Sequence, residues 1–370
     1  MVVNYLAITD IPSRYANALQ IIQMSNAIVK NGHKVNLIIP NFKSLNQSIK
    51  SYYDVSSKIN LIRLGKKKDK ITKIDNILLP LKLVLKNLLI KKDLIITRNL
   101  VISLILITFR IEHILELHDD LKISGNILSK IFKILRLLNS KYILRLVFIT
   151  NNLKKFVSKN YNYNRKNFKI LPDATSIITK KLPEKSNKTK FKIGYFGSIY
   201  KSRGIELIFK LAKLDKKNQY YIYGGTKFDK KKLKKFKLKN LRINSQIPYK
   251  KVKKKISQMD VLLMPYTEKV TTAGDVSNII NFMSPMKMFD YLGSGKILIT
   301  SNIKVLKEIL KNNYNSIIIK NYKSVNSWKK QIDQINLNKY KYLNIRLNAL
   351  QTAKKYTWEN RANQMLKNIQ

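Results

Sequence analysis

A basic loop that follows a glycine is the first segment of this 370-residue chain that could bind a charged ligand. In IGYFGSIYKSRGI, residues 193–205, we expect a strand to end at Gly197 and a helix to begin near Gly204. A glycine at a strand end lets a ligand approach the backbone closely. Lys201 and Arg203 could then neutralise a diphosphate that faces the helix N-terminus. A solvated basic loop is the competing interpretation.

A second candidate segment is SPMKMFDYLGSGK, residues 284–296. Ser284 is a good N-cap and Pro285 a good first helical residue, so the segment predicts a helix whose free amide groups could bind phosphate oxygens. Lys287 lies in the first turn. Asp290 lies six residues after the cap, and its carboxylate could accept hydrogen bonds from two adjacent sugar hydroxyls, as on a ribose. The competing interpretation is a solvent-facing aspartate on an ordinary helix.

The residue types argue against metal and redox cofactors. Cysteine is absent and no Asp-x-Asp occurs. His113 and His118 are five residues apart, which places them on opposite faces of a strand. No G-x-G-x-x-G follows the first expected strand, so a dinucleotide site is not indicated. We therefore expect metal-free chemistry and no cofactor.

Short apolar, β-branched runs alternate with helical segments along the whole chain, which predicts parallel sheets covered by helices. A polar, proline-containing linker is expected at residues 180–190. It separates two Rossmann-like, doubly wound α/β domains, residues 1–180 and 190–355, with ligands expected in a cleft at the strand ends. Strands are expected at residues 2–9, 34–40, 59–64, 93–97, 113–118, 147–150, 169–172, 192–197, 219–224, 241–244, 260–265, 296–300 and 316–320.

The chain is strongly basic, with 73 Lys and Arg against 21 Asp and Glu and a formal net charge of +52. Such a charge favours nucleic acids or anionic membrane surfaces as partners. However, 62 of the basic residues are lysines and 11 are arginines, whereas nucleic-acid readers favour the bidentate fork of arginine. The excess fits a composition-driven surface or an attraction to anionic lipid or phosphates, and no nucleic-acid partner is expected.

No membrane-spanning segment is expected, because the apolar run from Leu100 to Phe109 is half of the roughly 20 residues that a spanning helix needs. The stretch from Ile77 to Lys92, ILLPLKLVLKNLLIKK, could nevertheless lie in an anionic lipid interface. A crossover helix packed on its own sheet is the alternative. A second basic amphipathic stretch covers residues 129–145. Because no basic segment precedes the first strand, no signal peptide is expected. We expect a cytoplasmic protein, either free or peripheral on the inner face of the cytoplasmic membrane.

Taken together, these segments resemble the family-4 glycosyltransferases of the GT-B fold, in which two Rossmann-like domains face a central cleft. The segments GYFGSIYKSRGIELI, DVLLMPYTEK and SPMKMFDYLGSGKILITSNIKVLKEIL are similar, in order and spacing, to the carboxyl-terminal half of these enzymes. IPSRYANALQIIQMSNAIVKNGHKVNLIIP, DLIITRNL and ILELHDD resemble their N-domain. YTWENRANQML resembles their closing segment, so residues 356–370 would form a helix that crosses back to the first domain. The most specific part is the SPxK-type block SPMKMFDYLGSGK.

The resemblance implies a retaining, metal-independent transfer of a sugar of the hexose type from a UDP- or GDP-linked donor. The acceptor would be a glycan or lipid-linked glycan in cell-surface polysaccharide biosynthesis. In the usual mechanism of this family, a donor phosphate oxygen itself takes the acceptor proton. Preorganised cations and helix dipoles stabilise the leaving diphosphate.

Carried onto this sequence, the resemblance assigns the diphosphate to Lys201 and Arg203, although Ser198 stands where the family usually has a basic residue after the strand-end glycine. Asp290 takes the position of a ribose-binding glutamate, and Phe282 that of a second glutamate. Donor recognition would therefore rest on the helix start formed by Ser284, Pro285, Met286 and Lys287.

The remaining assignments from the resemblance concern the nucleotide base and the first domain. Gln246 and Tyr249 fall in the loop that usually contacts the base. His118 matches a histidine that faces the reacting sugar, with a satisfied strand-end histidine as the alternative. Arg14 and Asn17, in the first strand-helix loop, match acceptor-side or phosphate contacts.

Three other functions remain open from the sequence. A sugar-nucleotide 2-epimerase would need a cluster of acidic and histidine residues, for which three histidines and one matched carboxylate offer little. A non-catalytic binding module with a degenerate donor site would explain Asp290 and Phe282, and donor hydrolysis would distinguish it. A nucleic-acid-binding protein would need aromatic stacking platforms, which no aromatic-basic motif here supplies.

Overall fold

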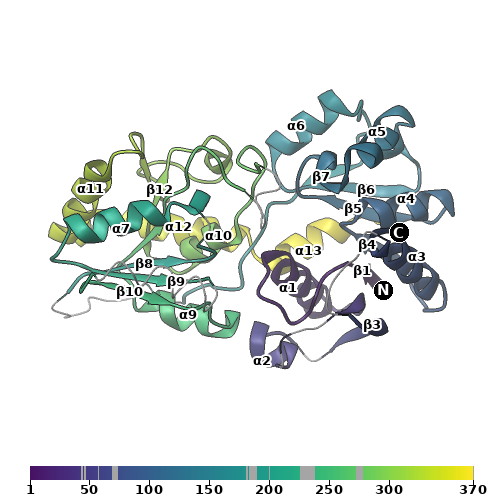
Figure 1. Cartoon of the computed structure of the whole chain (residues 1–370), viewed down its shortest axis with the longest axis horizontal. Coiled ribbons are helices and arrows are strands. Elements are labelled where there is room, and N and C mark those ends of the chain that lie inside the picture. Colours follow the sequence, from purple (N-terminus) through teal and green to yellow (C-terminus); the bar gives the residue numbers. More distant parts are fainter. Residues whose placement is uncertain are drawn as a thin grey trace. The chain divides into compact units, whose positions relative to one another are not determined.

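The computed structural model describes residues 1–42, 45, 47–56, 58–68, 74–180, 182, 190–199, 201–225, 238–271 and 278–369, without the side chains of residues 66–68 and 201. It divides the chain into two compact units, shown in Figure 1. Unit 1 comprises Met1–Asp173 and Trp358–Gln370, and unit 2 comprises Ala174–Thr357. Most of the linker expected at residues 180–190 lies outside the described residues. The division itself comes earlier in the chain, because the Thr175 and Thr179 amides donate to Tyr356 and Gly293 of unit 2 at 3.0 and 2.9 Å.

Unit 1 is built on a seven-stranded parallel sheet with the order β3-β2-β1-β4-β5-β6-β7. Its central strands read as continuous apolar runs because helices cover both faces. The strands are β1 (Val2–Leu6), β2 (Lys34–Phe42), β3 (Ile59–Lys68), β4 (Leu94–Thr97), β5 (His113–Leu117), β6 (Ile143–Phe148) and β7 (Phe168–Ile170).

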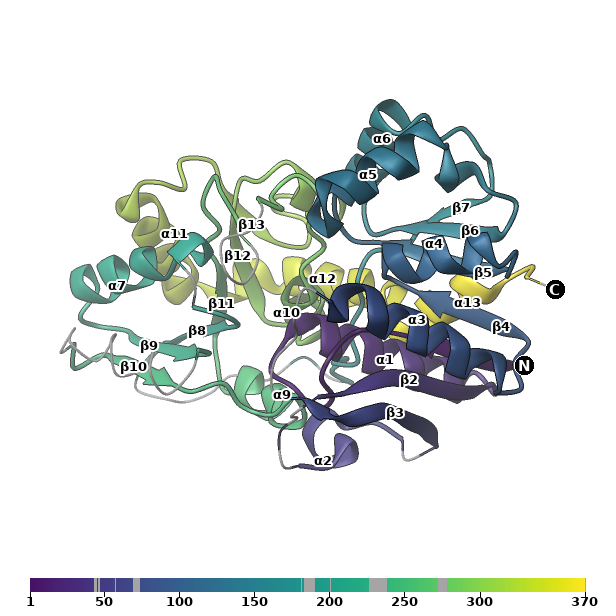
Figure 2. The same cartoon turned by 45° about the vertical axis from the view of Figure 1, so that its right-hand side comes forward.

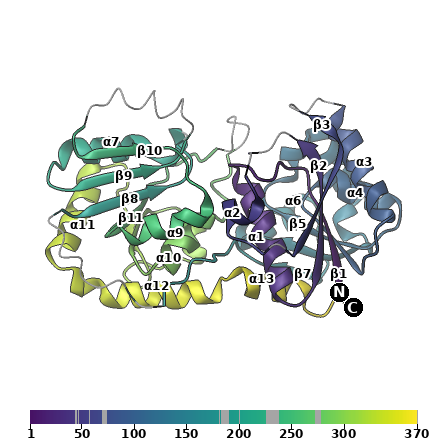
Figure 3. The ribbon, with the colours of Figure 1, turned by 90° about the horizontal axis from the view of Figure 1, so that it is seen from below.

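The strand order decides which helices share a face of this sheet. The connection from β1 to β2 runs one way along the sheet, and those from β3 to β7 run the other way. Because such crossovers are right-handed, α1 lies on one face and α3, α4, α5 and α6 on the other. Figures 1 and 3 show α1 with α13 on one side of the sheet and α3 with α4 on the other. The helices are α1 (Ala16–Lys30), α2 (Ile49–Tyr53), α3 (Asp75–Leu88), α4 (Leu100–Thr108), α5 (Asn126–Ile134), α6 (Asn151–Asn160) and α13 (Trp358–Leu366), with 3₁₀ turns η1 (Leu121–Ser124) and η2 (Leu137–Asn139).

Helix α13, from the end of the chain, is fixed to unit 1 by a buried ion pair. The Arg361 guanidinium donates to Glu116 Oε1 at 2.8 Å and to the carbonyl oxygens of Leu171 and Pro172 at 2.9 and 2.8 Å. Both charged side chains are almost fully buried. Burial opposes ionisation of Glu116, but Arg361 and His118 outweigh it and hold the pKa of this carboxyl well below its usual range. The pair ties α13 to β5 and to the segment that follows β7.

Unit 2 is built on a six-stranded parallel sheet with the order β10-β9-β8-β11-β12-β13. Helices α7 and α11 cover one face, and α9, α10 and α12 cover the other, as Figures 2 and 3 show. The strands are β8 (Lys192–Phe196), β9 (Gln219–Tyr223), β10 (Leu241–Asn244), β11 (Val261–Met264), β12 (Ile297–Ser301) and β13 (Ile317–Ile319). The helices are α7 (Ile205–Leu214), α9 (Tyr249–Ser257), α10 (Met286–Gly293), α11 (Val325–Leu337) and α12 (Leu343–Lys355), with 3₁₀ turns η3 (Lys201–Arg203), η4 (Val305–Glu308) and η5 (Lys339–Tyr342).

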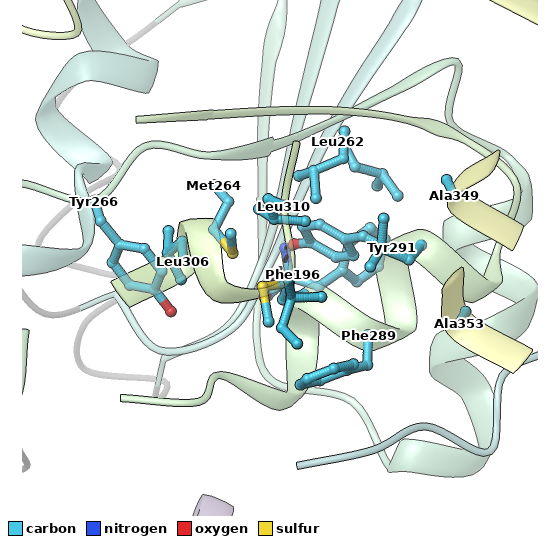
Figure 4. Close-up of a cluster of buried hydrophobic side chains, with 14 of the residues drawn as sticks. Phe196, Leu262, Met264, Tyr266, Phe289, Tyr291, Leu306, Leu310, Ala349 and Ala353 are labelled. Atoms are coloured by element: carbon cyan, nitrogen blue, oxygen red, sulfur yellow. Dashed lines mark hydrogen bonds between the residues drawn. The ribbon is translucent and has the colours of Figure 1, made fainter. Parts of the chain in front are cut away.

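The core of unit 2 sets the position of α10 against the sheet. Figure 4 shows Phe196 of β8 among buried side chains of α10, with Ala349 and Ala353 of α12 at the edge of the cluster. The two alanines let α12 approach α10 closely. The Tyr291 hydroxyl of α10 accepts from the Phe196 amide at 2.7 Å and donates to the Phe196 carbonyl at 3.2 Å. Packing and hydrogen bonds therefore hold the end of β8 beside α10.

The predicted architecture of two parallel α/β sheets is confirmed, and each of the thirteen expected strands has its counterpart. Several boundaries were wrong by two to four residues, among them the end of β1, the end of β3 and the start of β6. β6 begins at Ile143, so the end of the amphipathic stretch at residues 129–145 is strand, and Arg145 is buried with its Nη1 on the Met365 carbonyl at 2.6 Å. No helix in the described ranges is long and apolar enough to cross a bilayer.

Candidate functional site

The C-terminal end of β8 and the N-terminal end of α10 meet at Gly197. This residue has a φ of +143°, and a Cβ atom there would lie 2.7 Å from Lys287 Nζ. A side chain at this position would therefore be strained and would displace the amine. Glycine is required here, and it leaves the backbone open to the space in front of Lys287.

Lys287 is a half-buried cation in the first turn of α10. Its Nζ donates to Tyr195 Oη at 3.0 Å and lies 4.2 Å from the Tyr195 ring centroid and 5.3 Å from that of Tyr266. Burial, together with the nearby charge of Arg203, holds the pKa of Lys287 well below its usual range. The partial positive charge of the helix N-terminus acts in the same direction. A bound anion would relieve all three effects.

Arg203 is the second cation of this site. Its Nη2 donates to the Thr271 carbonyl at 3.0 Å, and its guanidinium carbon lies 5.6 Å from the Tyr266 ring centroid. Its Nε is buried without a hydrogen-bond partner among the residues that the structure describes. Within those residues, no carboxylate pairs with Arg203 or Lys287. The two cations share one aromatic ring and lack a described counter-ion, which is the charge pattern of an anion site.

The loop that carries Arg203 is held against the neighbouring strand. Gly204 directly follows η3 with a φ of +74°, and a Cβ atom there would lie 1.7 Å from the Pro265 carbonyl oxygen. Only glycine permits this close approach. The approach brings Arg203 to the end of β11, beside Tyr266.

Asp290 is buried on α10, one turn beyond Lys287. Its Oδ1 accepts from Thr175 Oγ1 at 2.6 Å and from Tyr249 Oη at 2.9 Å. Burial raises the pKa of this carboxyl to about 7, although the two hydroxyl groups oppose the shift. Both hydrogen bonds end on Oδ1, so Oδ2 remains the oxygen with which Asp290 could accept from a ligand hydroxyl.

The start of α10 differs by one residue from the sequence prediction. The helix begins at Met286, and the N-cap is Pro285 in an extended conformation, so the assignment of Ser284 as N-cap was wrong. The Pro285 carbonyl accepts from the Met288 amide at 2.9 Å and closes the first turn. Ser284 itself is buried. The first amide groups of an α-helix lack partners within the helix, so the start of α10 offers further donors in the turn that carries Lys287.

The other expected donor-binding residues lie around the same strand ends. The Ser198 carbonyl accepts from Tyr195 Oη at 2.6 Å. Gln246 follows β10 and is exposed. Its backbone amide donates to the Gly225 carbonyl at 3.2 Å. Tyr249 is the first residue of α9, and its hydroxyl is engaged by Asp290. Lys201 lies in η3, and its side chain is outside the described part of the chain.

His118 belongs to unit 1 and follows β5 directly. Its Nε2 contacts Glu116 Oε1, which also accepts from Gln20 Nε2 at 2.8 Å. Burial and the charge of Arg98 lower the pKa of His118 to about 4, so the imidazole is neutral near pH 7. With the Nε2 proton donated to Glu116, Nδ1 is the acceptor atom of the ring. A neutral histidine of this kind can accept a hydrogen bond from a hydroxyl group.

Arg14 and Asn17 lie on the exposed loop and first turn that lead into α1 of unit 1. Asn17 Nδ2 donates to Thr9 Oγ1 at 3.3 Å, and its Oδ1 accepts from the Ala18 amide at 2.9 Å. The Tyr53 hydroxyl holds the same loop through the Ser13 amide at 2.8 Å. The loop is thus well supported, and Asn17 contributes to its shape.

Sequence reasoning missed four residues that complete these sites: Tyr195, Tyr266, Thr175 and Glu116. The Glu116–His118 pair has a local signal, because residues two apart on a strand share a face. Tyr266 lies in the segment DVLLMPYTEK, but nothing in its spacing indicates a cation above the ring. Thr175 is 115 positions from Asp290 and leaves no local signal.

Comparisons with known proteins agree with this fold. Residues 177–352, nearly the whole of unit 2, match the family of glycosyl transferases group 1. No curated protein sequence is significantly similar to the chain. Among solved structures, the chain is similar to sucrose-phosphate synthase from Thermosynechococcus elongatus, with a TM-score of 0.71 and 14% identity over 98% of this chain and 97% of that one.

Two other structures are similar over equally long stretches. A glycosyltransferase from Rickettsia africae has a TM-score of 0.69 at 14% identity, covering 100% of this chain and 99% of its own. Anabaena HepE in complex with UDP-glucose has a TM-score of 0.70 at 11% identity, covering 99% and 98%. The chain therefore has the GT-B fold of two Rossmann-like units, and its second unit matches the glycosyl transferases group 1.

Proposed function

We propose that this chain is a glycosyltransferase that binds a nucleoside-diphosphate sugar in unit 2 and transfers the sugar to an acceptor hydroxyl. The observation that carries the proposal is the pair of cations, Arg203 and Lys287, over one Tyr266 ring at the ends of β8 and α10. The group 1 match over residues 177–352 supports it. So does the likeness to HepE, whose structure holds UDP-glucose.

In the proposed complex, the diphosphate occupies the space between Arg203, Lys287 and the first amides of α10. Gly197 allows a phosphate oxygen to reach the backbone, because a side chain there would occupy the position of the lysine amine. Asp290 Oδ2 would accept from the ribose, with Gln246 nearer the base. Lys201 would add a third cation from η3.

The reaction proposed is a retaining transfer that needs no metal ion. As the bond from the anomeric carbon to the diphosphate breaks, negative charge grows on the leaving group. The two cations and the α10 dipole would stabilise this charge, and preorganised electrostatics of this kind is often the largest contribution to catalysis. A donor phosphate oxygen would take the acceptor proton, as in the family that the sequence resembles. His118, neutral at pH 7, would accept a hydrogen bond from a sugar hydroxyl.

The acceptor we propose is a glycan or lipid-linked glycan of cell-surface polysaccharide biosynthesis, modified on the cytoplasmic side of the membrane. The family resemblance and the net charge of +52 support this class of acceptor. A hexose is the proposed sugar.

A thermal-shift screen with UDP, GDP, ADP and CMP, with and without Mg²⁺, tests donor binding first. A ligand at 100 times its Kd stabilises by about 2.7 kcal/mol. A metal-independent shift with one nucleoside diphosphate is expected, followed by turnover of the matching sugar donor. Binding without hydrolysis or transfer would instead identify a degenerate binding module, and the absence of any shift would refute a donor site in unit 2.

A double-mutant cycle then tests whether Gly197 acts through Lys287. A charge-assisted hydrogen bond contributes about 1.5–3 kcal/mol, so Lys287→Met should raise the Kd of the diphosphate by roughly 10- to 150-fold. Gly197→Ala should raise it as well, because the methyl group displaces the amine. In the double variant the two losses should not add. Full additivity would mean that Gly197 affects diphosphate binding independently of Lys287.

A further inference from the structure

Unit 1 carries an unusually apolar surface on the face of its sheet opposite α1. Nineteen large apolar side chains are exposed among the described residues, and eleven of them lie between Ile74 and Leu135. They come from α3 and its flanking residues, from the end of α4, and from η1 and α5. Figures 1 and 2 show α3, α4 and α5 following one another along unit 1. We call this surface the α3–α5 face.

The α3–α5 face repeats one pattern on its two outer helices. On α3, Leu78, Lys82, Leu85 and Leu89 follow at intervals of four, three and four residues, which places them on one side of the helix. On α5, Ile127, Lys130 and Ile134 have the last two of these intervals, and Ile123 precedes them in η1, on the other side of Gly125. All eight residues are exposed, and Leu89, Ile127 and Ile134 are more than three quarters exposed. Each helix therefore presents apolar side chains to solvent with lysine among them.

Helix α4 lies between α3 and the η1–α5 segment. Its sequence is LVISLILIT, and it contacts both α3 and η1. Leu100, Ile102 and Leu106 are buried, whereas Val101, Leu104 and Ile107 are only half-buried. A helix that is apolar all round is normally covered on all sides. The helix on the other face, α1, is covered in this way by α13.

The charge of the α3–α5 face has a single sign. Residues 76–92, 99–111 and 121–140 contain no Asp or Glu, and they include nine Lys and Arg. A second copy of the chain on this face would bring like charges together, which disfavours a symmetric dimer. Anionic headgroups would complement the cations, while the lysine stems lie along the apolar layer.

We propose that the α3–α5 face docks onto an anionic lipid bilayer, with α3, α4 and α5 lying in the interface. Exposed leucine and isoleucine side chains enter the headgroup boundary, and the lysines pair with anionic headgroups. This extends the lipid contact indicated by the sequence from Ile77 to Lys92 to a surface of three helices. It does not depend on the proposed transferase activity.

Flotation of the full chain with vesicles tests the proposal. Vesicles of phosphatidylcholine alone should bind weakly, and vesicles that also contain phosphatidylglycerol should bind in a salt-dependent manner. Each lysine near such a surface contributes about a fivefold factor in affinity, so Lys82→Glu with Lys86→Glu should weaken binding by roughly 30-fold or more. Leu89→Ser with Ile134→Ser should weaken it by at least about tenfold, since two apolar side chains leave the interface.

Two matched controls separate this surface from the overall charge. Lys210→Glu with Lys213→Glu changes the charge equally on exposed α7 of unit 2 and should leave binding almost unchanged. Leu214→Ser with Leu337→Ser removes two exposed leucines from unit 2 and should also have little effect. Far-UV circular dichroism and melting temperature check that every variant is folded.

Three results would overturn the proposal. Equal losses in the unit 2 controls would mean that general charge attraction drives binding. Unchanged binding of both unit 1 variants would exclude the α3–α5 face. A concentration-dependent dimer by light scattering, abolished by Leu89→Ser with Ile134→Ser, would show that a second copy covers the face. Because vesicle binding is measured without donor, it can fail while the thermal-shift screen succeeds, and the reverse also holds.

Discussion

Replacing Asp290 by Asn should stabilise unit 2 at alkaline pH much more than at acid pH. The carboxyl is buried on α10, and burial raises its pKa from 3.8 to about 7. The folded state therefore keeps a proton that the unfolded chain releases. Stability from this group is fully present below about pH 4, is lost between about pH 4 and 7, and stays lost at higher pH. Asn keeps Oδ1 as acceptor for Thr175 and Tyr249 and has no proton to lose.

The size of the effect follows from the pKa shift. One pKa unit corresponds to about 1.4 kcal/mol, so the ionised Asp290 destabilises the fold by roughly 4 kcal/mol above pH 7. At pH 5 the destabilisation is only about 1.5 kcal/mol. The advantage of the Asn variant should therefore grow by about 2.5 kcal/mol between pH 5 and pH 9. For a unit of this length, that is a change in the Tm difference of roughly 5–10 °C.

Differential scanning calorimetry of the two proteins at both pH values measures this change, because groups common to both cancel in the difference. Asp333→Asn is the matched control. Asp333 is a partly exposed carboxylate on α11 paired with Lys329, and such surface pairs contribute less than about 1 kcal/mol. A Tm difference for Asp290→Asn that is the same at pH 5 and pH 9 would refute the reasoning, since it would mean that solvation of the carboxylate is not lost on folding.

Two further predictions concern stability. Arg361→Met should destabilise unit 1 by about 3–5 kcal/mol, because it leaves Glu116 buried without its partner, and Glu116→Gln with Arg361→Met should recover part of the loss in denaturant unfolding; equal stability of the single and double variants would contradict this origin. Gly204→Ala should destabilise unit 2 by several kcal/mol, since the new Cβ would lie 1.7 Å from the Pro265 oxygen. Gly32→Ala has a similarly positive φ with nothing within 4 Å, so it should cost only about 1–2 kcal/mol; calorimetry that finds the two equal would assign the effect to φ alone.

The strands could be predicted from the sequence because each is a short apolar run between polar segments. Prediction failed where local patterns overlap. Ile143 to Arg145 continues the spacing of an amphipathic helix, yet it pairs as the start of β6. Pro285 displaced the helix start by one residue, because its own extended backbone takes the N-cap position that Ser284 was expected to fill.

The candidate site was only half predictable. Gly197, Arg203, Lys287 and Asp290 stand out by residue type and by their positions at strand and helix ends. Their actual contacts depend on folding. Lys287 reaches Gly197 because Tyr291 ties α10 to Phe196, 95 positions away along the chain. Such long-range contacts leave no periodic signal in the sequence.

The placement of α13 has a consequence for synthesis of the chain on the ribosome. Residues of unit 2 emerge before Arg361, so unit 2 can fold while unit 1 still lacks its last helix. During that interval the α1 surface that α13 will cover is open, and Glu116 lacks the guanidinium of Arg361. We therefore expect the uncovered α1 surface to be the part of nascent unit 1 that is open to chaperones until α13 has been made.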